Sequence, residues 1–151
     1  MAFLADERLA DGKAVDTEML RNLVQFIRMF AEQCHHGKEE QYLFPALTKN
    51  PVPHTRRVLK TLESEHRRVH TLTNGLAQAV SGYVLDPVAS RERVATIFRD
   101  IAAFYPRHIW KEEYLLFPIA KQVLSPSEQE EIGRGFSDIE PEIESDVHHA
   151  F

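Results

Sequence analysis

The chain has 151 residues, of which 43% are hydrophobic, and a net charge of −5, a composition typical of one globular domain. The single cysteine excludes a disulfide framework and a cysteine-rich zinc site, and the acidic balance argues against nucleic acid or an anionic membrane surface as partner. No apolar run is long enough to span a membrane and no signal peptide is visible, so we expect a cytoplasmic protein.

The first predicted helix follows an arm over residues 1–13. Asp16 has the character of an N-cap, and apolar residues at helical spacing follow it. This apolar stripe continues into His35 and Glu39, and the helix is expected to fade at Pro45 or one turn later. Asn50 to Pro53 then breaks the chain, because proline disfavours helix in the residue before it.

Three more helices are predicted by the same periodicity. The expected ranges are about 54–80, ended by Ser81 and Gly82; from near Ser90 to beyond Glu112, bent at Pro106; and about 127–139, interrupted by Pro141. No stretch alternates as a strand does. We therefore expect an all-α, up-and-down antiparallel bundle, with an arm at 1–13, a bundle at 14–125 and a C-terminal helix packing on it at 126–151.

An internal repeat is the most specific feature. Residues 34–45 read CHHGKEEQYLFP and residues 107–118 read RHIWKEEYLLFP, so both copies share H-x-x-K-E-E-x-x-L-F-P. In each copy a histidine and a glutamate stand four residues apart, on the apolar stripe of a helix: His35 with Glu39, and His108 with Glu112. An unpaired charge inside a bundle is very costly, and a metal ion relieves that cost.

The middle helix adds His66 and His70, again four residues apart on the inward stripe. One such pair is most often a surface ion pair, but three pairs on three apolar stripes predict a metal site. Imidazole with carboxylate suits iron, manganese or zinc, and two carboxylates able to bridge suggest two ions. The candidate ligands are His35, Glu39, His66, His70, His108 and Glu112.

The two repeats, with SEHRRVH between them, resemble the bacterial hemerythrin-like proteins over roughly residues 14–149. The resemblance implies an antiparallel four-helix bundle around two non-haem iron ions. His35 and His108 would each bind one iron, Glu39 and Glu112 would bridge them, and His66 would match the ligand of the next helix. His70 would match the second histidine of oxygen-carrying relatives.

One departure concerns the family's first helix, which supplies a further histidine, whereas no histidine precedes His35 here. His148 and His149 are the alternative donors, unless they belong to a solvated tail. The shortened helix would also leave an apolar groove beside Phe26 and Phe30, which residues 127–151 or a second subunit of a homodimer would cover. His36 is expected to lie on the helix surface beside the site.

Several side chains near the candidate ligands have more than one possible role. Glu63 or Glu65 could accept a hydrogen bond from a ligating imidazole, and the lysine of each repeat could pair with Glu40 or Glu113. Trp110 and Tyr114 could line the pocket or pack on a neighbouring helix.

The leading functional hypothesis is binding or sensing of O2 or NO at a di-iron centre. The alternatives are an enzyme that reacts with peroxide or O2 and a regulatory module with an incomplete, mononuclear site.

Overall fold

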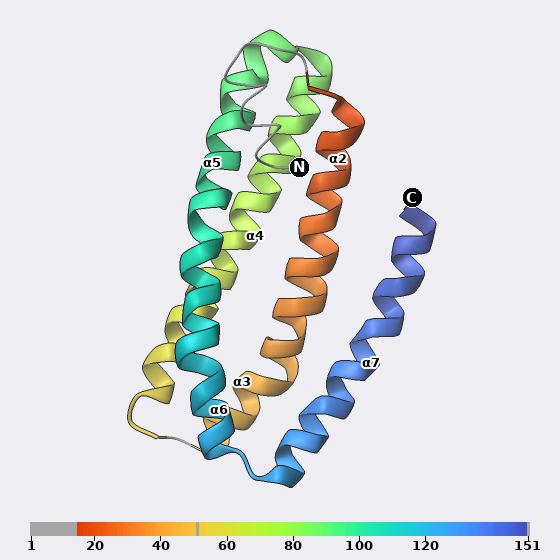
Figure 1. Cartoon of the computed structure of the whole chain (residues 1–151). Coiled ribbons are helices and arrows are strands. Elements are labelled where there is room, and N and C mark those ends of the chain that lie inside the picture. The colour runs from red at the N-terminus through yellow and green to blue at the C-terminus, as the bar shows by residue number, and fades with distance from the viewer. Residues whose placement is uncertain (1–14, 51, 151) are drawn as a thin grey trace.

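The computed structural model describes residues 15–50 and 52–150, with side chains up to residue 140. All the elements in this part of the chain are helical, which confirms the all-α class (Figure 1). In chain order they are α2 (Thr17–Phe26), η1 (Ile27–His36), η2 (Glu39–Leu43), α3 (Phe44–Lys49), α4 (Thr55–Leu85), α5 (Pro87–Lys111), η3 (Glu112–Leu116), α6 (Phe117–Val123) and α7 (Pro126–Ala150).

The helices run side by side as long rods (Figure 1). The rod from α2 to α3 packs on α4, which in turn packs along α5, while α7 lies against η1 and η2 on the opposite side of the first rod. The elements η1, η2 and η3 are π-helices, in which a hydrogen bond spans five residues instead of four. None of the described helices is both long and apolar enough to cross a lipid bilayer.

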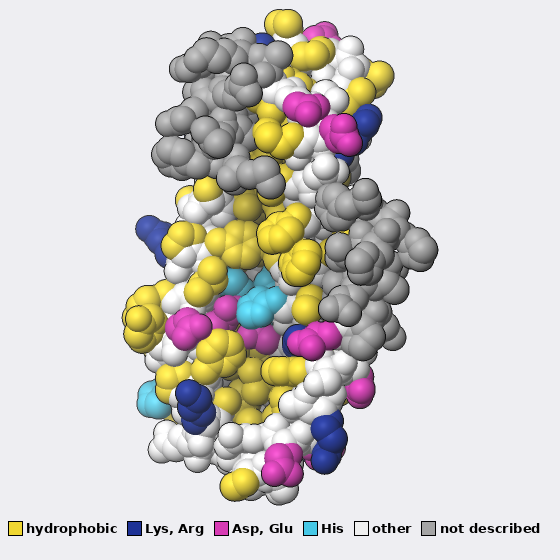
Figure 2. Space-filling model, turned by 45° about the vertical axis from the view of Figure 1, so that its right-hand side comes forward, with side chains coloured by type: hydrophobic (Ala, Val, Ile, Leu, Met, Phe, Trp, Pro, Cys, Tyr) yellow, Lys and Arg dark blue, Asp and Glu magenta, His cyan; other side chains and the backbone are white. Residues whose placement is uncertain are grey.

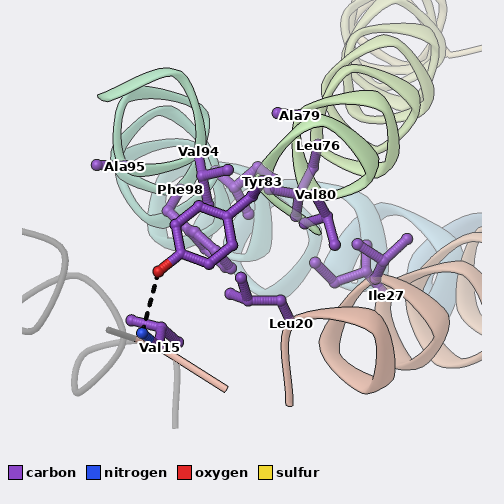
Figure 3. Packing of buried hydrophobic residues seen from close by; sticks show 12 residues of the cluster. Val15, Leu20, Ile27, Leu76, Ala79, Val80, Tyr83, Val94, Ala95 and Phe98 are labelled. Atoms are coloured by element: carbon purple, nitrogen blue, oxygen red, sulfur yellow. Dashed lines mark hydrogen bonds between the residues drawn. The ribbon is translucent and has the colours of Figure 1, made fainter. Parts of the chain in front are cut away.

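Two apolar clusters fill the two ends of the bundle. The first joins α2, α4 and α5, and its large buried members include Leu20, Leu76 and Phe98 (Figure 3). Tyr83 lies in the same cluster, and its hydroxyl accepts a hydrogen bond of 3.1 Å from the Val15 amide. Each fully buried leucine contributes about 2 kcal/mol to stability. The second cluster lies at the other end, where Leu43, Leu47, Leu59, Leu62 and Leu116 meet.

The helix starts follow the sequence closely, and two predicted helix ends are wrong. Asp16 caps α2 by accepting a hydrogen bond from the Glu18 amide, and Asp86 caps α5 in the same way. The α4 helix passes through Ser81 and Gly82 and ends at Leu85, because Asp86 leaves the helical conformation. Glycine inside a helix costs about 1 kcal/mol, which packing of neighbouring residues outweighs.

The C-terminal helix is longer than predicted. Pro141 does not interrupt α7, which extends from Pro126 to Ala150. The α5 helix likewise runs through Pro106. A proline removes one backbone hydrogen bond and kinks or strains a helix, but the residues on both sides can remain helical. Before Pro141, α7 packs on the first rod through Ile139 against Met29 and through Phe136 against Tyr42.

Candidate metal centre

A polar layer lies between the two apolar clusters. Its histidine and glutamate side chains are as buried as the leucines around them: His36, Glu39, His66, His108 and Glu112. They come from three rods, since η1 and η2 supply the first two, α4 the third, and α5 with η3 the last two. Charged or polar side chains are rarely buried so deeply without partners, so this layer is the candidate functional site.

The first donor group consists of three imidazoles. His36, His66 and His108 each offer one ring nitrogen, and these nitrogens all lie within 4.8 Å of one another. The His36 ring stacks on the His66 ring with 3.9 Å between centroids. Burial, followed by the nearby His66 and His108, lowers the pKa of His36 to about 2. His36 is therefore a neutral imidazole at physiological pH, which is the form that binds metals.

The second donor group contains one imidazole and two carboxylates. His35, Glu39 and Glu112 again offer atoms within 4.8 Å of one another. The His35 side chain is 44% exposed, and its Nε2 lies 3.2 Å from Oε2 of Glu112. That hydrogen bond raises the pKa of His35 against the effect of burial. This half of the layer therefore reaches solvent, whereas the first donor group is enclosed.

Two close contacts join the groups. Nε2 of His108 lies 2.7 Å from Oε1 of Glu112, and Nε2 of His66 lies 3.3 Å from Oε2 of Glu39. Burial alone would raise the pKa of Glu112, but the close contact with His108 and the hydrogen bond to His35 outweigh it and lower the pKa well below the usual range. Glu112 is therefore a carboxylate placed between both donor groups, as a bridging ligand must be.

Outer carboxylates fix the orientation of two imidazoles. Glu40 lies 2.7 Å from Nδ1 of His66, and Glu65 lies 3.0 Å from Nδ1 of His108. An acceptor at Nδ1 turns Nε2 of each ring toward the layer and raises its basicity as a ligand. The sequence offered Glu63 or Glu65 as the partner of a ligating imidazole, and the structure places Glu65 in that position, at His108. Glu65 also binds Lys111.

The polar layer fits a cation. Many of its inward atoms have no hydrogen-bond partner in the described part of the chain: both ring nitrogens of His36, Nε2 of His66 and of His108, both carboxylate oxygens of Glu39, and Oε1 of Glu112. Leaving one buried polar group unsatisfied costs about 1–3 kcal/mol. So many convergent lone pairs of nitrogen and oxygen are stabilised by a metal ion, and these donors suit iron, manganese or zinc.

Two placements differ from the sequence-based expectations. His36 was expected on the helix surface but is buried in the layer, while His70 was expected to face inward but is 50% exposed. Nδ1 of His70 lies 2.8 Å from Oε2 of Glu32, outside both donor groups. His35, Glu39, His66, His108 and Glu112 are brought together, and His36 joins them in place of His70.

The π-helix η1 is the physical reason that His36 turns inward. An α-helical stripe from Val24 and Ile27 would continue to residues 31 and 35, whereas a five-residue step from Ile27 to Glu32, followed by a four-residue step, leads to His36. Ala31 keeps the α-helical spacing apolar, so the spacing of hydrophobic residues does not signal this rotation. The side chains of His148 and His149 lie outside the described residues.

Two further polar side chains, Glu32 and Tyr105, lie next to the polar layer on the α2 side. Oε1 of Glu32 and the hydroxyl of Tyr105 are both buried without a hydrogen-bond partner among the described residues. Burial, together with the charges of Glu32 and Glu112, raises the pKa of Tyr105 to about 12. Tyr105 is therefore a neutral hydroxyl close to both glutamates.

One face of the molecule opens toward the site. Figure 2 shows a histidine side chain in a hollow, with acidic side chains beside it and hydrophobic side chains around it. His35 is the layer's partly exposed histidine, and the exposed Phe26 and Phe30 stack on each other with 4.9 Å between ring centroids on the same rod. The second donor group therefore reaches solvent through His35.

Comparison with known proteins decides the family. Residues 1–120 match the hemerythrin HHE cation binding domain. The chain belongs to the hemerythrin HHE cation-binding family. An uncharacterized protein of Mycobacterium bovis and two of Mycobacterium tuberculosis are each 28% identical over 124 residues, which cover 80% of this chain and 47% of the relative. The chain thus spans about half the length of these curated relatives, and no solved structure matches it.

Membership in this family agrees with the site's geometry. The family's name refers to cation binding, and the two repeats both lie inside the matched residues. The layer of convergent imidazole and carboxylate donors is the place where the described part of the chain could hold a metal. This layer is therefore the candidate metal centre of the domain.

Proposed function

We propose that this hemerythrin-family domain binds O2 or NO reversibly at two non-haem iron ions. His36, His66 and His108 hold one ion, and His35, Glu39 and Glu112 hold the other, with Glu112 touching both groups. The observation that carries the proposal is the pairing of an enclosed group of donors with one that reaches solvent through His35. When bound, the iron ions supply redox chemistry and exchangeable coordination positions for a diatomic ligand.

The protein's own residues orient the ligands, exclude water and offer a hydrogen bond to the bound molecule. Glu40 and Glu65 hold the rings of His66 and His108 so that Nε2 faces the centre. The apolar clusters on both sides exclude water from the enclosed donors. The neutral hydroxyl of Tyr105 offers a proton at the edge of the layer for a hydrogen bond to a polar ligand.

Spectroscopy on iron-loaded protein tests this proposal. We expect two irons per chain by metal analysis, and the reduced protein should develop a ligand-to-metal charge-transfer band in air that disappears when O2 is removed. NO should produce a distinct absorption spectrum under anaerobic conditions. A chain that carries two irons but whose spectrum does not respond to O2 or NO would contradict the proposed function.

A mononuclear regulatory module is the second candidate. The exposure of His35, and the small number of described donors beside it, favour weaker metal binding in the second group than in the first. Protein purified without chelator distinguishes the two candidates, because the module should carry one metal per chain at saturation. A second subunit over Phe26 and Phe30, and a cytoplasmic location, also remain predictions.

A further inference from the structure

An exposed aromatic face lies on the outside of α5 and η3. Trp110 is 53% exposed and Tyr114 is 66% exposed, and their rings stack with 5.5 Å between centroids. Ile109 and Leu115 extend the exposed apolar surface. The chain's single tryptophan is thus left in solvent, although tryptophan is normally well buried and is enriched at protein interfaces.

Helix geometry directs this face away from the metal centre. Trp110 follows the inward-facing His108 by two residues, a rotation of about 200° around an α-helix. Neither Trp110 nor Tyr114 belongs to the donor groups of the centre or to an apolar cluster of the described residues, and more than half of each side chain is exposed.

Two unpaired charges frame the tryptophan. Arg107 lies three residues before Trp110 and Glu113 lies three residues after it, and both side chains are exposed. Neither side chain makes an ion pair or a hydrogen bond within the described residues. The face therefore carries a positive charge on one side of its aromatic centre and a negative charge at equal distance on the other.

We propose that this face, formed by Arg107, Ile109, Trp110, Glu113 and Tyr114, binds a second copy of the chain. Two α5 helices packed antiparallel around a two-fold axis at Trp110 bring Arg107 of each copy level with Glu113 of the other. A two-fold interface must be complementary to itself, and this arrangement of charges meets that requirement. The tryptophans form the desolvated centre, and the charge pairs select the antiparallel orientation.

The second copy fits better than other occupants. An acidic partner would leave Glu113 facing like charge, and a basic partner would do the same to Arg107, whereas a second copy matches both. The proposal does not depend on the metal, because the face lies outside the donor layer. It also differs from a dimer over Phe26 and Phe30, which lie on the other rod.

Sedimentation velocity of the full chain over a range of concentrations tests the proposal. We expect a monomer–dimer equilibrium, and Trp110→Ala should weaken dimerisation by at least about tenfold, as loss of a central interface residue does. Arg107→Glu alone should also weaken it, because two like-charge pairs would form. The double variant Arg107→Glu with Glu113→Arg should restore dimerisation, because both pairs re-form with reversed polarity.

Matched controls keep the test specific. Leu85→Ala removes a side chain that is 87% exposed at the C-terminal end of α4, just before α5 begins, and should leave dimerisation unchanged. Circular dichroism confirms that each variant is folded. Three outcomes overturn the proposal. The chain could stay monomeric, even if Trp110 then mediates binding to phospholipid vesicles, or a dimer could form that Phe26→Ala disrupts and Trp110→Ala does not. In the third outcome, the double variant dimerises as weakly as Arg107→Glu alone.

Discussion

The two copies of the repeat share the same sequence motif but have different structural environments. His108 in the second copy is 1% exposed, whereas His35 at the equivalent position of the first copy is 44% exposed. In the first copy the next residue, His36, takes the enclosed position, while its counterpart Ile109 is exposed. The equivalent glutamates, Glu39 and Glu112, are both buried.

The difference arises from helix geometry. The first copy begins inside the ten-residue π-helix η1, whereas the second begins inside the α-helix α5; both then continue through a five-residue π-helical segment, η2 or η3. A π-helical turn contains more residues than an α-helical turn, so it rotates the following side chains by about one position. A sequence repeat therefore gives each copy the same donors, and the helix preceding it decides which donors are enclosed.

The largest expected effect distinguishes the two repeat histidines. His108→Ala should lower metal affinity about 100-fold or more, because it removes an enclosed ligand and leaves Glu65 unpaired. His35→Ala should remove the second metal and spare the first. Metal analysis with a chelator competition on each variant measures this, and equal losses would show that the two donor groups do not differ.

The next prediction concerns the neighbouring histidines. His36→Ala should weaken metal binding nearly as much as His108→Ala, since His36 belongs to the enclosed group. His70→Ala should change it less than about threefold, because His70 pairs with Glu32 at the surface. The same chelator competition applies. A strong effect of His70→Ala would restore the ligand set that the family resemblance implies.

A smaller effect is expected from the outer carboxylates. Glu40→Gln and Glu65→Gln should each weaken metal binding about tenfold, the lower end for residues that orient a ligand. Glu63→Gln is the matched control, since no hydrogen bond joins it to a histidine of the centre in the described structure. An equal response of all three variants would indicate a general charge effect and no orienting role.

The last prediction concerns the stability of the metal-free protein. The pKa of His36 is about 2 in the folded protein, against an ordinary value of 6.5, so below pH 6.5 the unfolded chain takes up a proton that the folded chain does not. The free energy of unfolding should therefore fall by about 1.4 kcal/mol for each pH unit from this group.

His35 and His108 do not mask this slope. Their raised pKa values stabilise the folded state, and that contribution is already complete below pH 6.5. The carboxylate of Glu112 loses its stabilising effect only below its ordinary pKa of 4.5. Urea unfolding with EDTA at several values between pH 4.5 and 6.5 measures the slope, and His36→Leu should reduce it. An unchanged slope in that variant would contradict the burial of His36.

The sequence by itself determined the helical class, the capping residue Asp16 of the first helix and five of the six residues of the polar layer, whereas Asp86, expected in a loop, caps α5. Periodicity and capping are local properties, and a buried carboxylate beside a histidine on an apolar stripe already requires a partner. The family followed from the repeat. The sequence could not locate the ends of α4 and α7, since packing outweighs the local cost of Gly82 and Pro141.

Only the tertiary structure decided which histidine completes the centre and which side chains remain in solvent. The burial of His36 depends on a π-helical rotation that apolar spacing does not reveal, and the partners Glu40 and Glu65 depend on how the rods face one another. The exposure of Trp110 has the same origin. A side chain's environment is set by the relative phase of packed helices, which is a property of the assembled bundle.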